Sequence, residues 1–225
     1  MGVDLKSRFE ALHREMVDQF ERTAAVENHW LIYALLGWEH LATCAVSQYL
    51  VHVKELQYPR WLYVVVWLAQ ICVALATIKF ISGRPRTEES PIESINKRIW
   101  TMFLFLCINV TVLNVTAGQP IFVFMPALAA LSAFGFTFMT SLISRRFMAA
   151  GLVMFVTGIL MAKFRLYEFL IYGVGWLVVL QTLSVVLWRR RSVWLSSLGA
   201  ENGREHVQAA GRAAGEFAAA GLVRQ

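Results

Sequence analysis

Glu39 and His40 are adjacent ionisable residues in the middle of an apolar segment that covers residues 29–53. A carboxyl group in an apolar medium must be protonated or paired, and an imidazole can donate, accept or transfer a proton there. Ionisable groups at such positions are candidates for proton or small-cation handling, and the alternative for each is a structural hydrogen bond between helices. Gln70 and Asn109 lie at similar depths in the second and third apolar segments. The sequence therefore predicts an ion- or proton-handling site formed by Glu39, His40, Gln70 and Asn109.

The first apolar segment has a broad face of polar or small residues around Glu39 and His40. Adjacent residues point about 100° apart on a helix, so these two side chains lie on neighbouring rows. Because polar groups of a membrane helix avoid lipid, we expect this face to be turned toward other helices. The two rows are Tyr33, Gly37, His40, Cys44 and Gln48, and beside them Glu39, Thr43 and Ser47.

Other catalytic or cofactor chemistry has little support in the residue types. The only two Asp residues, Asp4 and Asp18, lie outside the apolar segments, and motifs such as Gly-x-Ser-x-Gly or Cys-x-x-Cys are absent. The histidines of the apolar segments, His29, His40 and His52, all belong to the first one, so a single chain cannot ligate haem from facing helices. We expect no catalytic residue, no bound metal and no cofactor in one chain, and the residues favour a non-enzymatic protein. Haem or metal shared across a subunit interface is left open.

The composition indicates a membrane protein. Of the 225 residues, 57% are hydrophobic and 16% are charged, whereas soluble domains have about 45–50% apolar and about 25% charged residues. From Ile99 to Ser144, 46 residues include no charge and no His, and the turn Ala117-Gly118-Gln119-Pro120 divides this run into two helices. We therefore expect an all-α polytopic membrane helix bundle with six transmembrane helices. These cover about residues 29–53, 61–80, 98–117, 120–143, 147–163 and 167–188.

Lys and Arg residues indicate the orientation of the six helices. Of the 21, 17 lie before the first segment, in the second and fourth connections or in the tail, and four lie in the other connections. Because cytoplasmic loops retain positive residues, both termini are predicted to be cytoplasmic, in a bacterial inner membrane. The net charge of +6 then reflects topology, and we expect no nucleic-acid partner.

Residues 1–28 are predicted to form a cytoplasmic amphipathic helix, because apolar residues recur there at intervals of three or four. The opposite face carries both signs of charge, whereas helices that lie on anionic lipid are rich in Lys and Arg. We therefore expect the apolar stripe to dock against protein, and lying at the bilayer interface is the alternative. The stripe consists of Leu5, Phe9, Leu12, Met16 and Phe20.

The chain is thus divided into the amphipathic helix of residues 1–28, a six-span domain of residues 29–188 and a tail of residues 189–225. The tail is cytoplasmic, rich in Ala and Gly, and expected to be weakly ordered. The leading hypothesis is a small non-enzymatic integral membrane protein, a proton- or cation-handling transporter or channel subunit, in which Glu39 titrates. The alternative is a membrane scaffold or sensor that docks a cytoplasmic partner through its first helix. In either case we expect contact with the lipid bilayer and assembly as a homo-oligomer or membrane-complex subunit.

Overall fold

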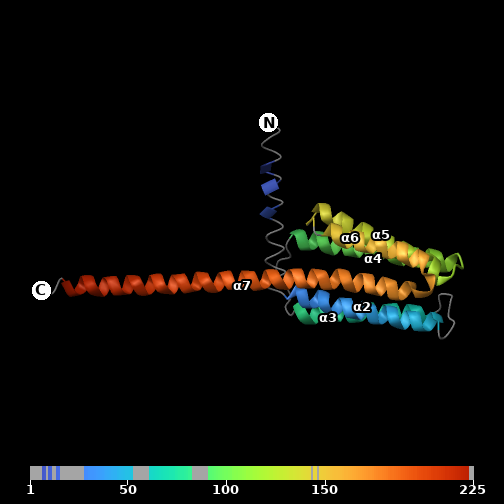
Figure 1. Cartoon of the computed structure of the whole chain (residues 1–225), viewed down its shortest axis with the longest axis horizontal. Coiled ribbons are helices and arrows are strands. Elements are labelled where there is room, and N and C mark those ends of the chain that lie inside the picture. The colour runs from blue at the N-terminus through green and yellow to red at the C-terminus, as the bar shows by residue number, and fades with distance from the viewer. Residues whose placement is uncertain are drawn as a thin grey trace.

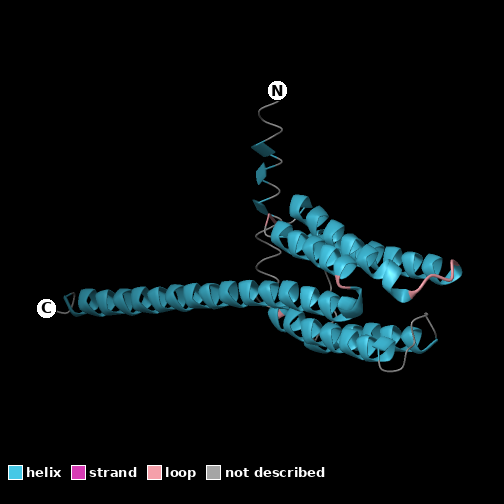
Figure 2. Cartoon of the chain, turned by 45° about the vertical axis from the view of Figure 1, so that its right-hand side comes forward, coloured by secondary structure: helices cyan, strands magenta, loops and turns pink. Residues whose placement is uncertain are grey.

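The computed structural model describes residues 7–8, 10–11, 14–15, 28–52, 61–82, 91–142, 144–145 and 147–222. All regular structure within these ranges is helical, as Figure 2 shows, so the prediction of an all-α protein is confirmed there. Each of the six predicted segments coincides with one helix. The helices are α2 (His29–His52), α3 (Trp61–Ser82), α4 (Pro91–Thr116), α5 (Ile121–Leu142), α6 (Phe147–Lys163) and α7 (Glu168–Leu222), with a short 3-10 helix, η1 (Arg165–Tyr167), before α7.

The turn between α4 and α5 lies where the sequence predicts it. Gly118 adopts a positive φ of 64°, a conformation that glycine tolerates without a steric cost. Asn114 holds the turn from inside α4, because its Nδ2 donates to the carbonyl oxygen of Gln119 at 3.3 Å. Pro120 then precedes the first residue of α5. The long uncharged run therefore forms a helical hairpin.

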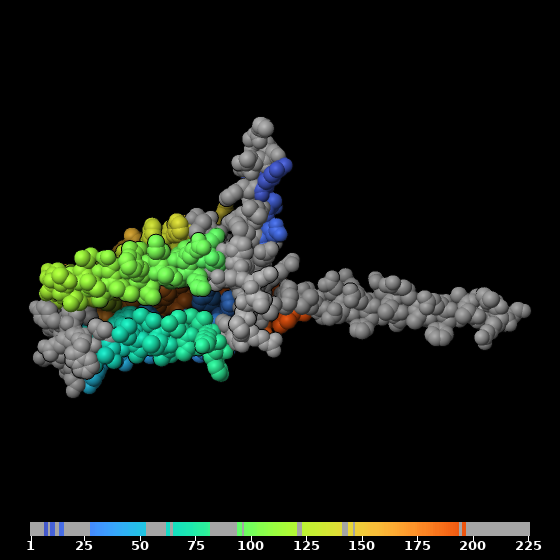
Figure 3. All heavy atoms as spheres, turned by 180° about the vertical axis from the view of Figure 1, so that it is seen from behind, coloured from blue at the N-terminus to red at the C-terminus, as the bar shows by residue number. Residues whose placement is uncertain are grey.

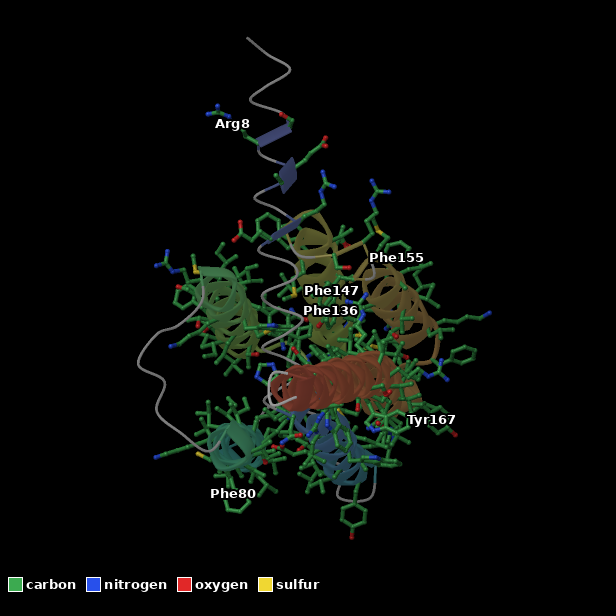
Figure 4. The ribbon with its side chains drawn as sticks, turned by 90° about the vertical axis from the view of Figure 1, so that its left-hand side faces the viewer. Arg8, Phe80, Phe136, Phe147, Phe155 and Tyr167 are labelled. Carbon is green, nitrogen blue, oxygen red and sulfur yellow. The ribbon has the colours of Figure 1, made fainter. Side chains whose placement is uncertain are left out.

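Three helical segments are long and apolar enough to cross a membrane: Lys97–Thr116 of α4, Val123–Thr140 of α5, and Arg165–Val193, which covers η1 and the first part of α7. Val65–Ile81 of α3 and Phe147–Lys163 of α6 are shorter apolar helices. Large apolar side chains also face outward, among them Phe80, which is 88% exposed, and Phe155, both labelled in Figure 4. Soluble proteins rarely expose such continuous apolar surfaces. The helices thus have the character of a membrane bundle.

In Figures 1 and 4, α7 lies at the centre of the bundle, between α2 and α3 on one side and α4, α5 and α6 on the other. It packs most extensively against α2, while α5 packs mainly against α6. The core includes the fully buried Phe136, Met154 and Phe169 from α5, α6 and α7. Phe136 also stacks on Phe147, with ring centroids 6.4 Å apart (Figure 4). The central position of α7 means that any site on its surface is lined by several helices.

The two ends of the chain differ in what the structure describes. Within the predicted amphipathic helix of residues 1–28, residues 7–8, 10–11 and 14–15 are described as helical and exposed, and Asn28 is described in a turn before α2. All five residues of the apolar stripe lie outside the described residues, so their docking stays a prediction. The predicted boundary at residue 189 falls inside α7, which continues to Leu222. The weak order expected of the tail likewise stays a prediction.

Candidate functional site

His40 of α2 and Gln70 of α3 are in direct contact. The side-chain Nε2 of Gln70 donates a hydrogen bond to Nδ1 of His40 at 2.6 Å, so the neutral imidazole carries its hydrogen on Nε2. The two residues lie 30 positions apart in the sequence and come together because α2 and α3 form an antiparallel hairpin. Two of the residues that the sequence selected by depth are therefore brought together.

Aromatic rings from two helices enclose the His40 imidazole. The ring centroid of Trp67 on α3 lies 5.8 Å from it, and those of Tyr172 and Trp176 on α7 lie at 5.3 Å and 5.4 Å. Tyr172 is buried and shares a hydrogen bond of 3.2 Å with Ser132 of α5. Aromatic pairs in such tilted or edge-on arrangements are favourable beyond the area they bury. The imidazole is thus held in a defined position inside the bundle.

Trp176 connects this site to the other half of the bundle. Its ring lies 5.4 Å from Phe136 of α5, 5.9 Å from Trp100 of α4 and 6.2 Å from Phe103 of α4. Figure 3 shows a furrow between α3 and α4 in which parts of α2 and α7 are visible. The helices that carry His40 and Trp176 therefore form the floor of that furrow.

Glu39 directs its carboxyl group toward α3. Both carboxyl oxygens are buried and have no hydrogen-bond partner among the described residues, although the residue as a whole is only half-buried. The backbone of Ala74 on α3 lies near the carboxyl group, but no hydrogen bond of normal geometry joins the two. A carboxyl in this position is more easily kept neutral than charged, because nothing nearby compensates a negative charge.

Asn109, the fourth residue that the sequence selected, lies apart from this cluster. Its side chain is exposed on α4. The residues of α4 that pack against the core include Trp100, Phe103, Cys107 and Val110, at the helical spacing of three and four. Asn109 lies about 100° around the helix from Val110, away from this face, and therefore points elsewhere. The structure groups Glu39, His40 and Gln70, and leaves Asn109 on a separate surface.

Polar contacts between α2 and α7 were not selected from the sequence. Gln48 Nε2 donates to the carbonyl oxygen of Leu166 at 2.5 Å, next to the start of α7. Three further bonds join the opposite ends of the two helices. They run from Gln181 Nε2 to the Ala34 carbonyl at 2.9 Å, from Ser184 Oγ to the Trp30 carbonyl at 2.7 Å, and from Arg191 Nη1 to Asn28 Oδ1. In the sequence, the polar positions of the first segment match those of the last segment in reverse order. This match becomes visible only when the two helices are known to be paired.

Glu168 is a second buried acid, and it lies at the start of the predicted sixth segment. The first residue of α7 is only 2% exposed, and its Oε2 has no hydrogen-bond partner among the described residues. Its ionisable neighbours are Arg165 on η1 and Tyr63 on α3. Tyr63 is itself buried and stacks on Phe169, with ring centroids 6.4 Å apart. No pattern in the sequence separates Glu168 from an ordinary acidic residue in the first turn of a helix.

Buried polar atoms without a hydrogen-bond partner are confined to one side of the bundle. In the described part of the chain there are nine, and all belong to α2, α3 or α7. Native proteins leave few such atoms, and each requires an explanation such as catalysis, a bound ligand or water. They are Nε1 of Trp30, both carboxyl oxygens of Glu39, Nε2 of His40, Oγ of Ser47, Oε1 of Gln48, Oε1 of Gln70, Oε2 of Glu168 and Nε1 of Trp176.

Metal ligands are not grouped in the same way. Among the described residues, no three side chains of His, Cys, Asp or Glu come together as a metal-binding group. Cys44 is buried between α2 and α7, Cys72 is exposed and Cys107 is half-buried on α4. The available donors around His40 are therefore suited to protons and hydrogen bonds. Comparisons with protein families, with curated proteins and with solved structures give no match for this chain.

Proposed function

We propose that this protein is a proton-handling integral membrane protein, a transporter or channel subunit, in which Glu39 binds and releases the proton. The observation that carries the proposal is the arrangement of three polar side chains inside the bundle. His40 Nδ1 and Gln70 Nε2 are 2.6 Å apart, and the carboxyl oxygens of the adjacent Glu39 are buried without a hydrogen-bond partner among the described residues. Ionisable groups inside a membrane are costly and are a mark of proton and ion pathways.

The proposal includes six transmembrane helices with both termini in the cytoplasm. The shortest helix, α6, has 17 residues and is about 26 Å long, which is at the lower limit for a bilayer. The helices α2, α3 and α6 run alongside the apolar helices α4, α5 and α7 (Figures 1 and 4). If α4, α5 and α7 cross a bilayer, the other three helices cross it with them. The distribution of Lys and Arg supports cytoplasmic termini, and the proposal takes the membrane to be a bacterial inner membrane.

Protons fit this site better than metal cations do. A hard cation such as Ca²⁺ takes six to eight oxygen ligands, whereas the rings around His40 offer mainly carbon. A proton needs only one basic atom, and the Glu39 carboxylate and the His40 imidazole each provide one. Gln70 Nε2 donates to Nδ1 and fixes the imidazole, so the exchangeable proton of the neutral ring is the one on Nε2.

The steps assigned to these residues are simple. The Glu39 carboxylate takes up a proton and becomes neutral, which removes the cost of a buried charge. His40 can then take that proton on Nδ1, the nitrogen to which the Gln70 amide donates, and release the proton that it carries on Nε2. Each transfer moves one proton and no other atom. The rate of proton transfer across the membrane should therefore depend on the pH on both sides.

The proposal is tested with purified protein in liposomes. A potassium gradient with valinomycin sets the membrane potential, and a trapped dye reports the internal pH. The wild type should acidify or alkalinise the vesicles faster than empty liposomes, and Glu39→Gln should slow this by roughly a hundredfold. Thr182→Val is the matched control, because this exposed side chain on α7 bonds only its own helix. Equal rates for wild type, Glu39→Gln and empty liposomes would refute the proposal and favour the scaffold hypothesis.

A further inference from the structure

Glu168 and Glu39 lie along the same face of α3. Tyr63, Trp67, Gln70 and Ala74 recur at intervals of four, three and four, which places them in one row of that helix. Tyr63 is the neighbour of Glu168, Trp67 and Gln70 contact His40, and Ala74 faces the Glu39 carboxyl. One row of α3 therefore extends from the buried acid at the start of α7 to the buried acid in the middle of α2.

The facing row of α2 is polar between these two acids. Ser47 is fully buried, and Gln48 is 8% exposed, and each has a side-chain atom without a hydrogen-bond partner among the described residues. Gln48 also bonds the Leu166 carbonyl, two residues before Glu168. From His40 to Gln48 is eight residues, a rise of about 12 Å along α2. Incompletely bonded polar groups thus continue from His40 to the end of the bundle where Glu168 lies.

We propose that Glu168 is a second proton-binding carboxyl, joined to Glu39 and His40 by the polar groups of Ser47 and Gln48 between α2, α3 and α7. We call this set of residues the polar seam. Its ligand is water and the proton that water carries. The inference rests on the proposed function, because a path for protons has a purpose only if Glu39 handles them.

The other half of the α2–α7 interface is closed by direct hydrogen bonds. Gln181 and Ser184 bond the α2 backbone, and Arg191 bonds Asn28, so these side chains have partners on the facing helix. At Gly37 the helices approach so closely that an added Cβ would lie 3.2 Å from Gln181 Nε2. The proposed path therefore covers one half of the α2–α7 interface. Polar side chains link Glu39 to the Glu168 end, while direct hydrogen bonds hold the two helices together toward the Asn28 end.

The polar seam is too closely packed to pass larger ions. The unpaired atoms of Ser47, Gln48 and Glu168 are buried, so the seam encloses no open column of water. Water enters such a place only transiently, which suits slow proton transfer between groups and excludes hydrated cations. The charged and titratable neighbours of Glu168 are Arg165 and Tyr63, and both should influence how readily its proton is released.

A simpler role for Glu168 makes a different prediction. An acidic residue in the first turn of a helix is stabilised by the positive end of the helix dipole. If that were its whole role, Glu168→Gln would lower thermal stability slightly and leave proton flux unchanged. Flux and exchange of the carboxyl proton, measured separately from stability, therefore distinguish the two roles.

The experiment compares Glu168→Gln, Glu168→Asp and Glu39→Gln in the liposome assay, with infrared difference spectra of the same samples after a pH change. We expect Glu168→Gln to slow flux by roughly tenfold or more and to remove one carboxyl band that responds to pH. Glu168→Asp keeps a carboxyl and should retain more flux than Glu168→Gln. Thr116→Val is the matched control, because this exposed hydroxyl on α4 bonds only its own helix.

The outcomes separate this inference from the proposed function. Loss of flux in Glu39→Gln with wild-type flux in Glu168→Gln overturns the role of Glu168 and leaves that of Glu39. Wild-type flux in both variants removes the proposed function itself. If Glu168→Gln does not fold, the infrared spectra of the wild type and of Glu39→Gln decide. Besides the band of Glu39, the wild type should show a pH-dependent band from another buried carboxyl, and that band should remain in Glu39→Gln. Its presence in both samples supports the inference, and its absence overturns it.

Discussion

Gly173 of α7 lies directly against Cys44 of α2. A Cβ placed on Gly173 would be 2.8 Å from the Cβ of Cys44, closer than such atoms approach, and 3.1 Å from Cδ1 of Leu41, which is tighter than most such contacts. The absence of a side chain at this position therefore allows the two helix backbones to come together, as small residues do in membrane helix pairs. The same contact sets the alignment of α2 and α7, and with it the positions of His40 and Trp176.

Gly173→Ala should separate α2 from α7. Because the added methyl group meets the Cβ of Cys44, which belongs to the base of a side chain, the backbone must shift, at a cost of about 1–3 kcal/mol. The thermal unfolding midpoint in detergent should fall. Gly135→Ala is the control, since its nearest neighbour, Phe103 Cδ2, would be 3.8 Å away. Equal midpoints for the two variants would mean that α2 and α7 do not pack as described.

Gln70→Leu should leave the His40 imidazole without the hydrogen bond that fixes it. An unsatisfied buried polar group costs about 1–3 kcal/mol, and the ring should lose its preferred tautomer. Nitrogen-15 NMR of labelled histidine would show a changed signal for one of the five residues. Asn109→Leu serves as the comparison, because that exposed side chain is remote from the cluster. A similar change in both variants would show that Asn109 also acts on His40.

Phe9→Ser combined with Met16→Ser should disrupt assembly without preventing membrane insertion. Each large apolar side chain contributes roughly 1.5–3 kcal/mol if it is fully buried, so the pair accounts for much of the docking energy of the predicted stripe. Blue native electrophoresis would show a smaller assembly. The control variant carries Glu10→Ser and Glu15→Ser, two exposed positions of the same region. An unchanged assembly in the Phe9 and Met16 variant would mean that the stripe lies on lipid instead.

Cysteine labelling should establish the orientation. In a background without the three native cysteines, Arg84→Cys and Arg204→Cys should react with an impermeant maleimide only from the cytoplasmic side. Arg165→Cys in η1, which is exposed, should react from the outside. The reverse pattern would invert the topology. Labelling of all three from one side would contradict the odd numbers of spans, three and one, that separate Arg165 from Arg84 and from Arg204 in the six-span arrangement.

The helices were predictable from the sequence because apolar length alone determines them. The turn at Gly118 was also predictable, since it interrupts the longest uncharged run. The contact between His40 and Gln70 followed partly from depth, because adjacent antiparallel segments bring equal depths together. Depth does not specify rotation about the helix axis, and for that reason Asn109 was grouped with residues that its helix turns away from.

Glu168 and the pairing of the first and last helices required the structure. A residue at a helix start in a short connection has the same sequence appearance whether it is exposed or buried. Its burial depends on Tyr63, which is more than a hundred positions away. Likewise, Gln48 and Gln181 become partners of the facing backbone only once α2 and α7 are neighbours.

The confinement of unpaired polar atoms to α2, α3 and α7 has a consequence for mutational tolerance. In α5 and α6 the buried polar side chains that the structure describes have partners, as Ser132 has in Tyr172. Other contacts there are close and apolar, as at Gly158, where an added Cβ would lie 3.4 Å from the Cβ of Ala129. Apolar exchanges of similar volume should be accepted there. In the other helices a single polar replacement alters several incompletely bonded neighbours at once, so substitution effects should not add. In a saturation mutagenesis library of the whole chain, we therefore expect more tolerated substitutions on the α5 and α6 side of α7 than on the α2 and α3 side.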